Sequence, residues 1–130
     1  MGKDIAIFGV NNRRGDIRVK EIDKLAKEEL EKANKIYPLF ASDHEGWAVL
    51  FEKCIEAKQG MSEIIERDEY GEIFEMFNCI MDDCVDETRK RVENISRYAM
   101  YTAVNLIQII AMCDKFIKSQ EMRNEAGENI

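Results

Sequence analysis

Two glutamates, Glu52 and Glu56, stand four residues apart in a stretch whose apolar residues recur at helical spacing. On a helix, residues four apart lie one turn above the other, so the two carboxylates are neighbours. Neighbouring carboxylates repel each other unless a cation or a basic group lies between them. Mg2+ is such a cation, because proteins bind it through one or two carboxylates together with substrate phosphates. Spacing alone favours the other interpretation, a solvated acidic face of a helix, and both interpretations stay open at this point.

The helix that carries these acids is predicted to run from Asp43 to Ile65. Ser42 followed three residues later by Glu45 fits a capping box, which places the helix start at Asp43. Spacings of three and four also predict that one face of this helix is buried. The residues of that face are Trp47, Leu50, Phe51, Cys54, Met61, Ile64 and Ile65.

Two amides, Asn105 and Gln108, interrupt the most apolar stretch of the chain, residues 98–113. Because they are three residues apart, they share one face of a helix. Burying an amide is unfavourable unless it finds hydrogen-bond partners. Those partners are either neighbours on packed helices or the facing pair Glu52 and Glu56, and the pattern leaves both alternatives open.

Three further helices are predicted. The first covers residues 19–37 and is ended by Pro38, because proline cannot continue the hydrogen-bond ladder. The next covers residues 70–95 and the last covers residues 96–119, with a break near Asn94 and Ser96 unless the two form one bent helix.

The fold class that follows is all-α, an antiparallel four-helix bundle. Residues 1–18 are expected to form a short extended N-terminal arm with a strand-like segment at 5–10, and residues 121–130 a frayed tail. Residues 19–120 make up the helical domain. Since residues 98–113 are apolar on nearly every side, they belong at the centre of a bundle or in a subunit interface. The second of these alternatives agrees with an oligomer.

Composition narrows the classes of function. The chain has 130 residues, enough for one domain, and a net charge of −7, which argues against a nucleic-acid-binding surface. The four cysteines form no C-x-x-C pair and are expected to be buried apolar residues in a reducing compartment. Residues 98–113 are too short and too polar to span a bilayer. A cytoplasmic protein with no membrane contact is the expectation.

The sequence resembles a known family over residues 20–118. Three segments carry the resemblance: Ile36-Tyr37-Pro38, then His44-Glu45-Gly46-Trp47-Ala48-Val49, then Asn105-Leu106-Ile107-Gln108-Ile109-Ile110-Ala111-Met112. They are similar to segments of the MazG-like, all-α nucleoside triphosphate pyrophosphohydrolases, in particular the branch found in phages of Gram-positive bacteria. The resemblance implies hydrolysis of a nucleoside or deoxynucleoside triphosphate to the monophosphate and pyrophosphate. It also implies Mg2+, or Mn2+ in its place, and assembly as a homodimer or homotetramer.

Carried over residue by residue, the family's pattern is incomplete in this chain. Glu52 and Glu56 match the first and third acids of the family's first motif, and are the expected catalytic residues and metal ligands. Lys53 stands where the second acid is expected, and Asn105 replaces the acid that opens the second motif. Gln108 matches the variant found in the phage branch. With two carboxylates missing, the metal site is expected to be weakened, while Lys53 is able to contact a phosphate directly.

Three hypotheses remain at this stage. The first is a pyrophosphohydrolase with a weakened metal site, in which Lys53, Asn105, Gln108 and Trp47 bind the substrate. The second is a catalytically inactive relative that binds or sequesters a nucleotide or a protein partner, for example a phage-encoded inhibitor of a host protein. The third is an interaction protein without a small ligand. Trp47 is expected in the core, although its ring is also able to stack on a nucleobase, and His44 is expected to cap or pack rather than act as a base.

Overall fold

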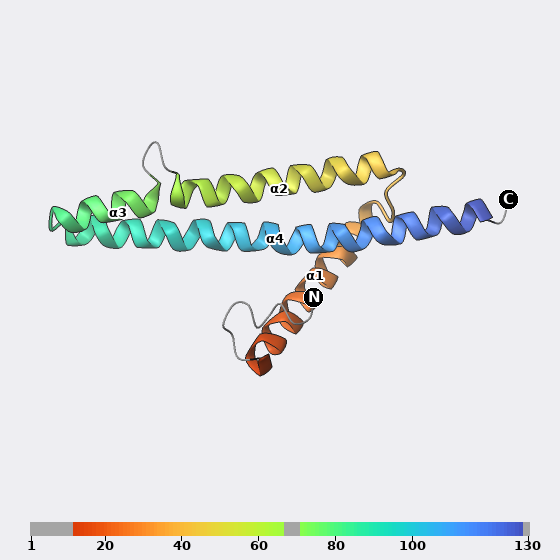
Figure 1. Ribbon diagram of the computed structural model, residues 1–130, viewed down its shortest axis with the longest axis horizontal. Coiled ribbons are helices and arrows are strands. Elements are labelled where there is room, and N and C mark those ends of the chain that lie inside the picture. Colours follow the sequence, from red (N-terminus) through yellow and green to blue (C-terminus); the bar gives the residue numbers. More distant parts are fainter. Residues whose placement is uncertain (1–11, 67–70, 129–130) are drawn as a thin grey trace.

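The computed structural model describes residues 12–66 and 71–128. Four helices account for nearly all of them: α1 (Asn12–Ile36), α2 (Asp43–Ile65), α3 (Glu72–Met81) and α4 (Val85–Glu128) (Figure 1). The described residues contain no strand, which confirms the all-α class. The strand-like segment expected at residues 5–10 lies outside the described residues.

The long helix α4 is the axis of the molecule. Helices α2 and α3 follow one another along α4 and run antiparallel to it, whereas α1 crosses α4 and points away from the rod (Figure 1). Each of the other three helices packs closely on α4, whereas no Cα atom of α1 lies within 8 Å of a Cα atom of α2 or α3. Residues that meet at the crossing of α1, α2 and α4 are therefore held together through α4.

Helix α1 starts earlier than predicted and ends where predicted. It begins at Asn12, so residues 12–18 are helical rather than part of an extended arm. Gly15 is the weakest helix former in this stretch, because glycine in a helix is about 1 kcal/mol less favourable than alanine. Arg14 and Arg18 favour the helix. The helix ends at Ile36, just before the Tyr37-Pro38 step.

The break between the last two helices lies at residues 82–84, and the prediction of a break near Asn94 and Ser96 is wrong. Asp83 adopts a positive φ of 56°, a conformation that aspartate tolerates better than most residues. The chain reverses there, and the start of α4 runs back along α3 (Figure 1). The side chain of Asn94 instead donates a hydrogen bond of 3.2 Å to Glu72 at the start of α3. Arg91 forms a salt bridge of 3.3 Å to the same carboxylate.

The N-terminal cap of α2 is confirmed. Ser42 accepts a hydrogen bond of 3.2 Å from the Glu45 amide, and the helix begins at Asp43. The Glu45 carboxylate closes the cap by accepting a hydrogen bond of 3.4 Å from the Ala41 amide.

The face that α2 packs against α4 differs from the predicted one. Small residues dominate it: Gly46 and Ala57 are buried, and a Cβ placed on Gly60 would collide with Thr102 of α4. Most of the large residues predicted to be buried are exposed instead, namely Trp47, Phe51, Cys54, Met61 and Ile65. Leu50 is half-buried and Ile64 is buried. Because small side chains let two helices approach closely, backbone proximity selects this face over the bulkier one.

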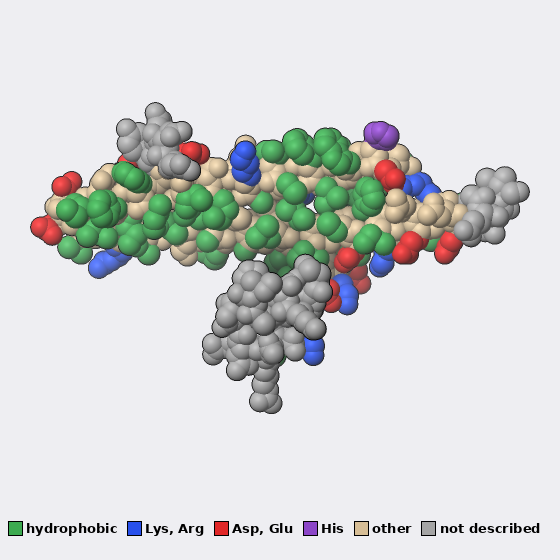
Figure 2. Space-filling view, in the orientation of Figure 1, with side chains coloured by type: hydrophobic (Ala, Val, Ile, Leu, Met, Phe, Trp, Pro, Cys, Tyr) green, Lys and Arg blue, Asp and Glu red, His purple; other side chains and the backbone are tan. Residues whose placement is uncertain are grey.

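The buried core lies where α1, the loop at residues 37–42 and α2 converge on α4. Leu30, Phe40, Ala111 and Met112 form it, and Val49, Leu50, Phe116 and Ala33 pack around it. Helix α3 buries none of its residues. Large hydrophobic side chains are exposed along the rod of α2, α3 and α4 (Figure 2).

Three of the four cysteines, Cys54, Cys84 and Cys113, are exposed on the single chain, and Cys79 is half-buried. The expectation that all four are buried is wrong for the single chain. The cysteines lie on stretches with apolar periodicity, but three of them are on exposed faces of their helices in the single chain.

One helix in the described part of the chain, α4, meets the length and composition of a membrane span. Residues Val85–Ala126 contain an 18-residue window of mean hydropathy 1.2, of which 22% is buried. The central helix of a water-soluble bundle has the same properties. The sequence-based expectation that residues 98–113 are too short and too polar to span a bilayer stays a prediction.

Candidate functional site

Two close contacts fix the register of α2 against α4. Gly46 lies against the ring of Phe116, and Gly60 lies against Thr102. Since the two helices are antiparallel, this register places Asn105 at the level of Ala57, the residue after Glu56. Gln108 is correspondingly at the level of Lys53 and Cys54. The predicted acids and amides thus lie on facing helices, at neighbouring levels.

The two glutamates differ in their surroundings. Glu52 is exposed, and among the described residues its carboxylate has no hydrogen bond or ion pair. Glu56 is half-buried and lies 3.8 Å from the ammonium of Lys53. Lys53, on the same helix, is therefore the basic group that offsets the charge of the neighbouring acids.

The donors suit a metal poorly. Among the described residues, no group of three or more His, Cys, Asp or Glu side chains is arranged to hold a metal ion. The two carboxylates of α2 suit at most one Mg2+, and only with phosphate oxygens from a ligand as further donors. Asn105 offers a neutral oxygen, which does not help to neutralise an ion.

Lys53 and Gln108 line the same hollow, of about 290 Å3, between α1, α2 and α4. Helix α1 contributes Glu29 and Lys32 to this hollow, and its apolar lining comes from Ala33, Ile36 and Met112. We call it the Lys53 hollow. The sequence did not predict the contribution of α1, because alternating Lys and Glu on a surface helix also describes an ordinary solvated face.

Trp47 lies on a different flank of α2 from the Lys53 hollow. Trp47 is 63% exposed as a residue, and its ring stacks on Phe51, with ring centroids 5.1 Å apart. It lines a separate hollow with His44, Leu50 and Phe116. The expectation that Trp47 belongs to the core is wrong, because the close approach of α2 to α4 turns this residue outward. His44 is exposed at the start of α2 (Figure 2).

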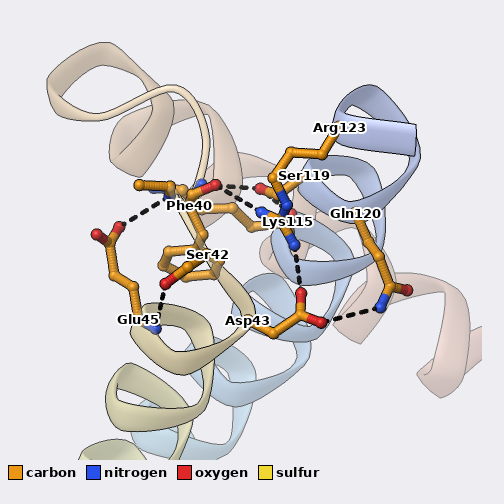
Figure 3. Close-up of polar contacts among 9 residues, drawn as sticks. Phe40, Ser42, Asp43, Glu45, Lys115, Ser119, Gln120 and Arg123 are labelled. Carbon is orange, nitrogen blue, oxygen red and sulfur yellow. Dashed lines mark hydrogen bonds and ion pairs between the residues drawn. The ribbon is translucent and has the colours of Figure 1, made fainter. Parts of the chain in front are cut away.

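The loop between α1 and α2 is held by side chains of α4 (Figure 3). Ser119 is fully buried and accepts a hydrogen bond of 2.8 Å from the Phe40 amide. Arg123 donates to the Phe40 carbonyl at 2.8 Å and pairs with Asp43 at the start of α2. These bonds satisfy the amide and the carbonyl of Phe40 where the loop packs against α4.

Lys115 is the charged side chain in this network that is buried. Its ammonium donates to the Tyr37 carbonyl and lies 4.9 Å from the centre of the Phe40 ring. Only 5% of the residue is exposed. Burial lowers the pKa of Lys115, and the nearby carboxylate of Glu45 offsets part of that change. No sequence pattern marked this lysine, since its carbonyl and aromatic partners come from a loop far away in the chain.

Comparison of the chain with protein-family models found no matching family, and comparisons with curated proteins and with solved structures found no significant match.

Proposed function

We propose that this chain is a MazG-like helical protein that binds the phosphates of a nucleoside triphosphate, and that binding rather than hydrolysis is its principal activity. The Lys53 hollow carries this proposal. Two lysines from different helices, Lys32 and Lys53, line it together with the amide of Gln108. Ammonium and amide N–H groups are donors for phosphate oxygens, and they need no metal to bind them.

The position of Glu56 supports binding over catalysis. Its carboxylate is already paired with Lys53, which a metal ion would have to displace. When a phosphate enters the hollow, Lys53 is able to turn from Glu56 to the ligand, because the side chain is flexible and its ammonium has three donors.

A second candidate is slow, Mg2+-dependent pyrophosphohydrolysis, or the same reaction with Mn2+. One observation favours it: Glu52 and Glu56 lie one turn apart on α2, and the register sets Asn105 opposite the turn that carries Glu56. Glu52 and Glu56 would hold one ion together with phosphate oxygens. Such an ion, when bound, supplies neutralisation of phosphate charge.

We further propose that the protein is a cytoplasmic homodimer or homotetramer in which the four-helix bundle is completed between copies. The single chain exposes 10136 Å2, whereas a folded monomer of 15.1 kDa exposes about 7,000 Å2. The outer face of α2 carries Trp47, Phe51 and Ile65, each more than half exposed, and α3 has no buried residue. A second copy packed on these faces would cover them without a membrane. The Lys53 hollow, which lies on the other flank of α2, would stay open.

Binding of the full-length protein to inorganic tripolyphosphate and to nucleoside triphosphates tests the first proposal. Calorimetry without metal is expected to show binding, and Lys53→Met is expected to weaken it by about tenfold or more, the effect of losing a charge-assisted hydrogen bond. Lys90→Met removes an exposed charge at the start of α4 and serves as the matched control. Equal affinities for wild type and Lys53→Met, or no binding of any triphosphate, would contradict the proposal.

Restoring the missing acids tests the second candidate. The double variant Lys53→Glu, Asn105→Glu is expected to release pyrophosphate from a triphosphate in Mg2+ at least about tenfold faster than wild type, equivalent to ~1.4 kcal/mol of barrier. Lys90→Glu, which adds an acid far from the site, is expected to leave the rate unchanged. If the double variant forms no product from any nucleoside triphosphate, the hydrolytic candidate is to be abandoned.

A further inference from the structure

A second hollow adjoins the Lys53 hollow. It encloses about 440 Å3 and shares Ala33, Ile36 and Met112 with the first. The two hollows therefore lie next to each other between α1, α2 and α4. The phosphate-binding groups line the first, and the loop at residues 37–42 contributes to the second.

The chemistry of the second hollow is mixed. Its wall is largely apolar, with aromatic rings from Tyr37 and Phe40 and the side chain of Val49. Two charged side chains also line it, Lys115 and Glu45. An apolar pocket with a few polar groups is the usual form of a small-molecule site.

The two charged groups keep unused hydrogen-bonding capacity. Lys115 has three N–H donors, of which the Tyr37 carbonyl takes one, while the Phe40 ring lies beside the ammonium. The carboxylate of Glu45 accepts from the Ala41 amide through one oxygen, which leaves the other oxygen as an acceptor. One donor and one acceptor beside aromatic rings match the edge and the face of a nucleobase, which carries adjacent acceptors and donors on a flat ring.

We propose that this second hollow binds the base of the nucleotide whose phosphates occupy the Lys53 hollow, with Lys115 donating to the base, Glu45 accepting from it, and Tyr37 and Phe40 contacting its ring. This inference rests on the proposed function, since it assigns the other half of the same ligand. It assigns base recognition to the loop between α1 and α2, and not to Trp47, which lines a different hollow.

The test compares inorganic tripolyphosphate with the four ribonucleoside triphosphates on the full-length protein by calorimetry. At least one nucleotide is expected to bind about 10-fold to 100-fold more tightly than tripolyphosphate, the range that base stacking contributes. Lys115→Met and Val49→Phe are expected to remove this difference while the affinity for tripolyphosphate stays the same. Val49→Phe fills the second hollow only, because Val49 does not line the first. Leu50→Phe, at a residue that lines the Trp47 hollow instead, is the matched control.

Retained tripolyphosphate binding shows that a variant is folded and separates the two proposals. If tripolyphosphate and nucleotides bind equally to wild type, the base pocket is refuted and phosphate binding stands. If nucleotides bind more tightly but Val49→Phe and Lys115→Met preserve the difference, the base lies elsewhere and the inference fails. If neither probe binds, both proposals fall together.

Discussion

Replacing Phe51 by glutamate is expected to convert the proposed oligomer into monomers. Phe51 is 52% exposed in the single chain and stacks on Trp47, so the two rings form an apolar projection from the outer face of α2. Aromatic side chains of this kind are the usual centres of protein interfaces. A carboxylate at this point would have to be buried without a partner on assembly, which costs several kcal/mol per copy.

The surface area of the chain indicates how large the effect should be. The single chain exposes about 3,000 Å2 more than a compact protein of its mass. Interfaces of obligate homodimers bury about 2,000 Å2 or more in total. An assembly that covers most of this excess area depends on the apolar centre of its interface. One charge at that centre should therefore shift the equilibrium between oligomer and monomer by several orders of magnitude.

Light scattering coupled to size-exclusion chromatography measures the outcome. Wild type is expected at two or four times 15.1 kDa and Phe51→Glu at the mass of one chain. Gln59→Glu adds the same charge at an exposed position on another flank of α2, and is expected to leave the mass unchanged. A wild-type protein that runs as a monomer would remove the basis for the proposed assembly. An oligomeric Phe51→Glu variant would move the interface to another face.

The helical class and two of the helix ends were predictable because they depend on local chemistry. The Ser42 cap and the stop before Pro38 involve residues close in sequence, and both are found where the sequence predicts them. The turn at Asp83 was missed because apolar periodicity continues on both sides of it. A pair of aspartates, Asp82 and Asp83, was the available signal, since aspartate tolerates the left-handed conformation that reverses the chain.

The buried face of α2 was not predictable from hydrophobicity. Two stripes on this helix are compatible with burial, one of large residues such as Trp47 and one built on Gly46, Ala57 and Gly60. A hydrophobicity pattern selects the large residues. The packing of α2 on α4 instead buries the small residues and leaves the large ones exposed.

The candidate site was predictable only in part. Lys53 and Gln108 were selected from sequence, and the structure brings them to one hollow. Lys32 and Lys115 were not, because their importance comes from the crossing of α1 over α4 and from the loop that α4 holds. Such contacts join residues distant in sequence, and no local pattern encodes them.

The packing of α2 on α4 depends on two glycines, and replacing both by leucine is expected to destabilise it strongly. A Cβ at Gly46 would lie 2.8 Å from one ring carbon of Phe116 and nearer still to another, and a Cβ at Gly60 would collide with the Thr102 hydroxyl. Phe116 packs against the core and Thr102 is buried, so neither is free to move aside. Overpacking of this kind costs about 1–3 kcal/mol at each site.

Because the two glycines contact different residues of α4, far apart along the helix, their effects should add to about 2–6 kcal/mol. That is a large fraction of the ~5–15 kcal/mol that stabilises a typical domain. Denaturation by urea at one fixed protein concentration measures the loss of free energy of unfolding as a lower midpoint. Ala48→Leu is the control, because it adds a comparable side chain at an exposed position of the same helix. Ala48→Leu is expected to change the free energy of unfolding by less than about 0.5 kcal/mol.

An equal midpoint for the double variant and this control would show that α2 does not rest on α4 through its glycines. The register that sets Asn105 and Gln108 beside Glu56 and Lys53 would then rest on the remaining contacts between the two helices, such as those of Asp43 with Gln120 and Arg123.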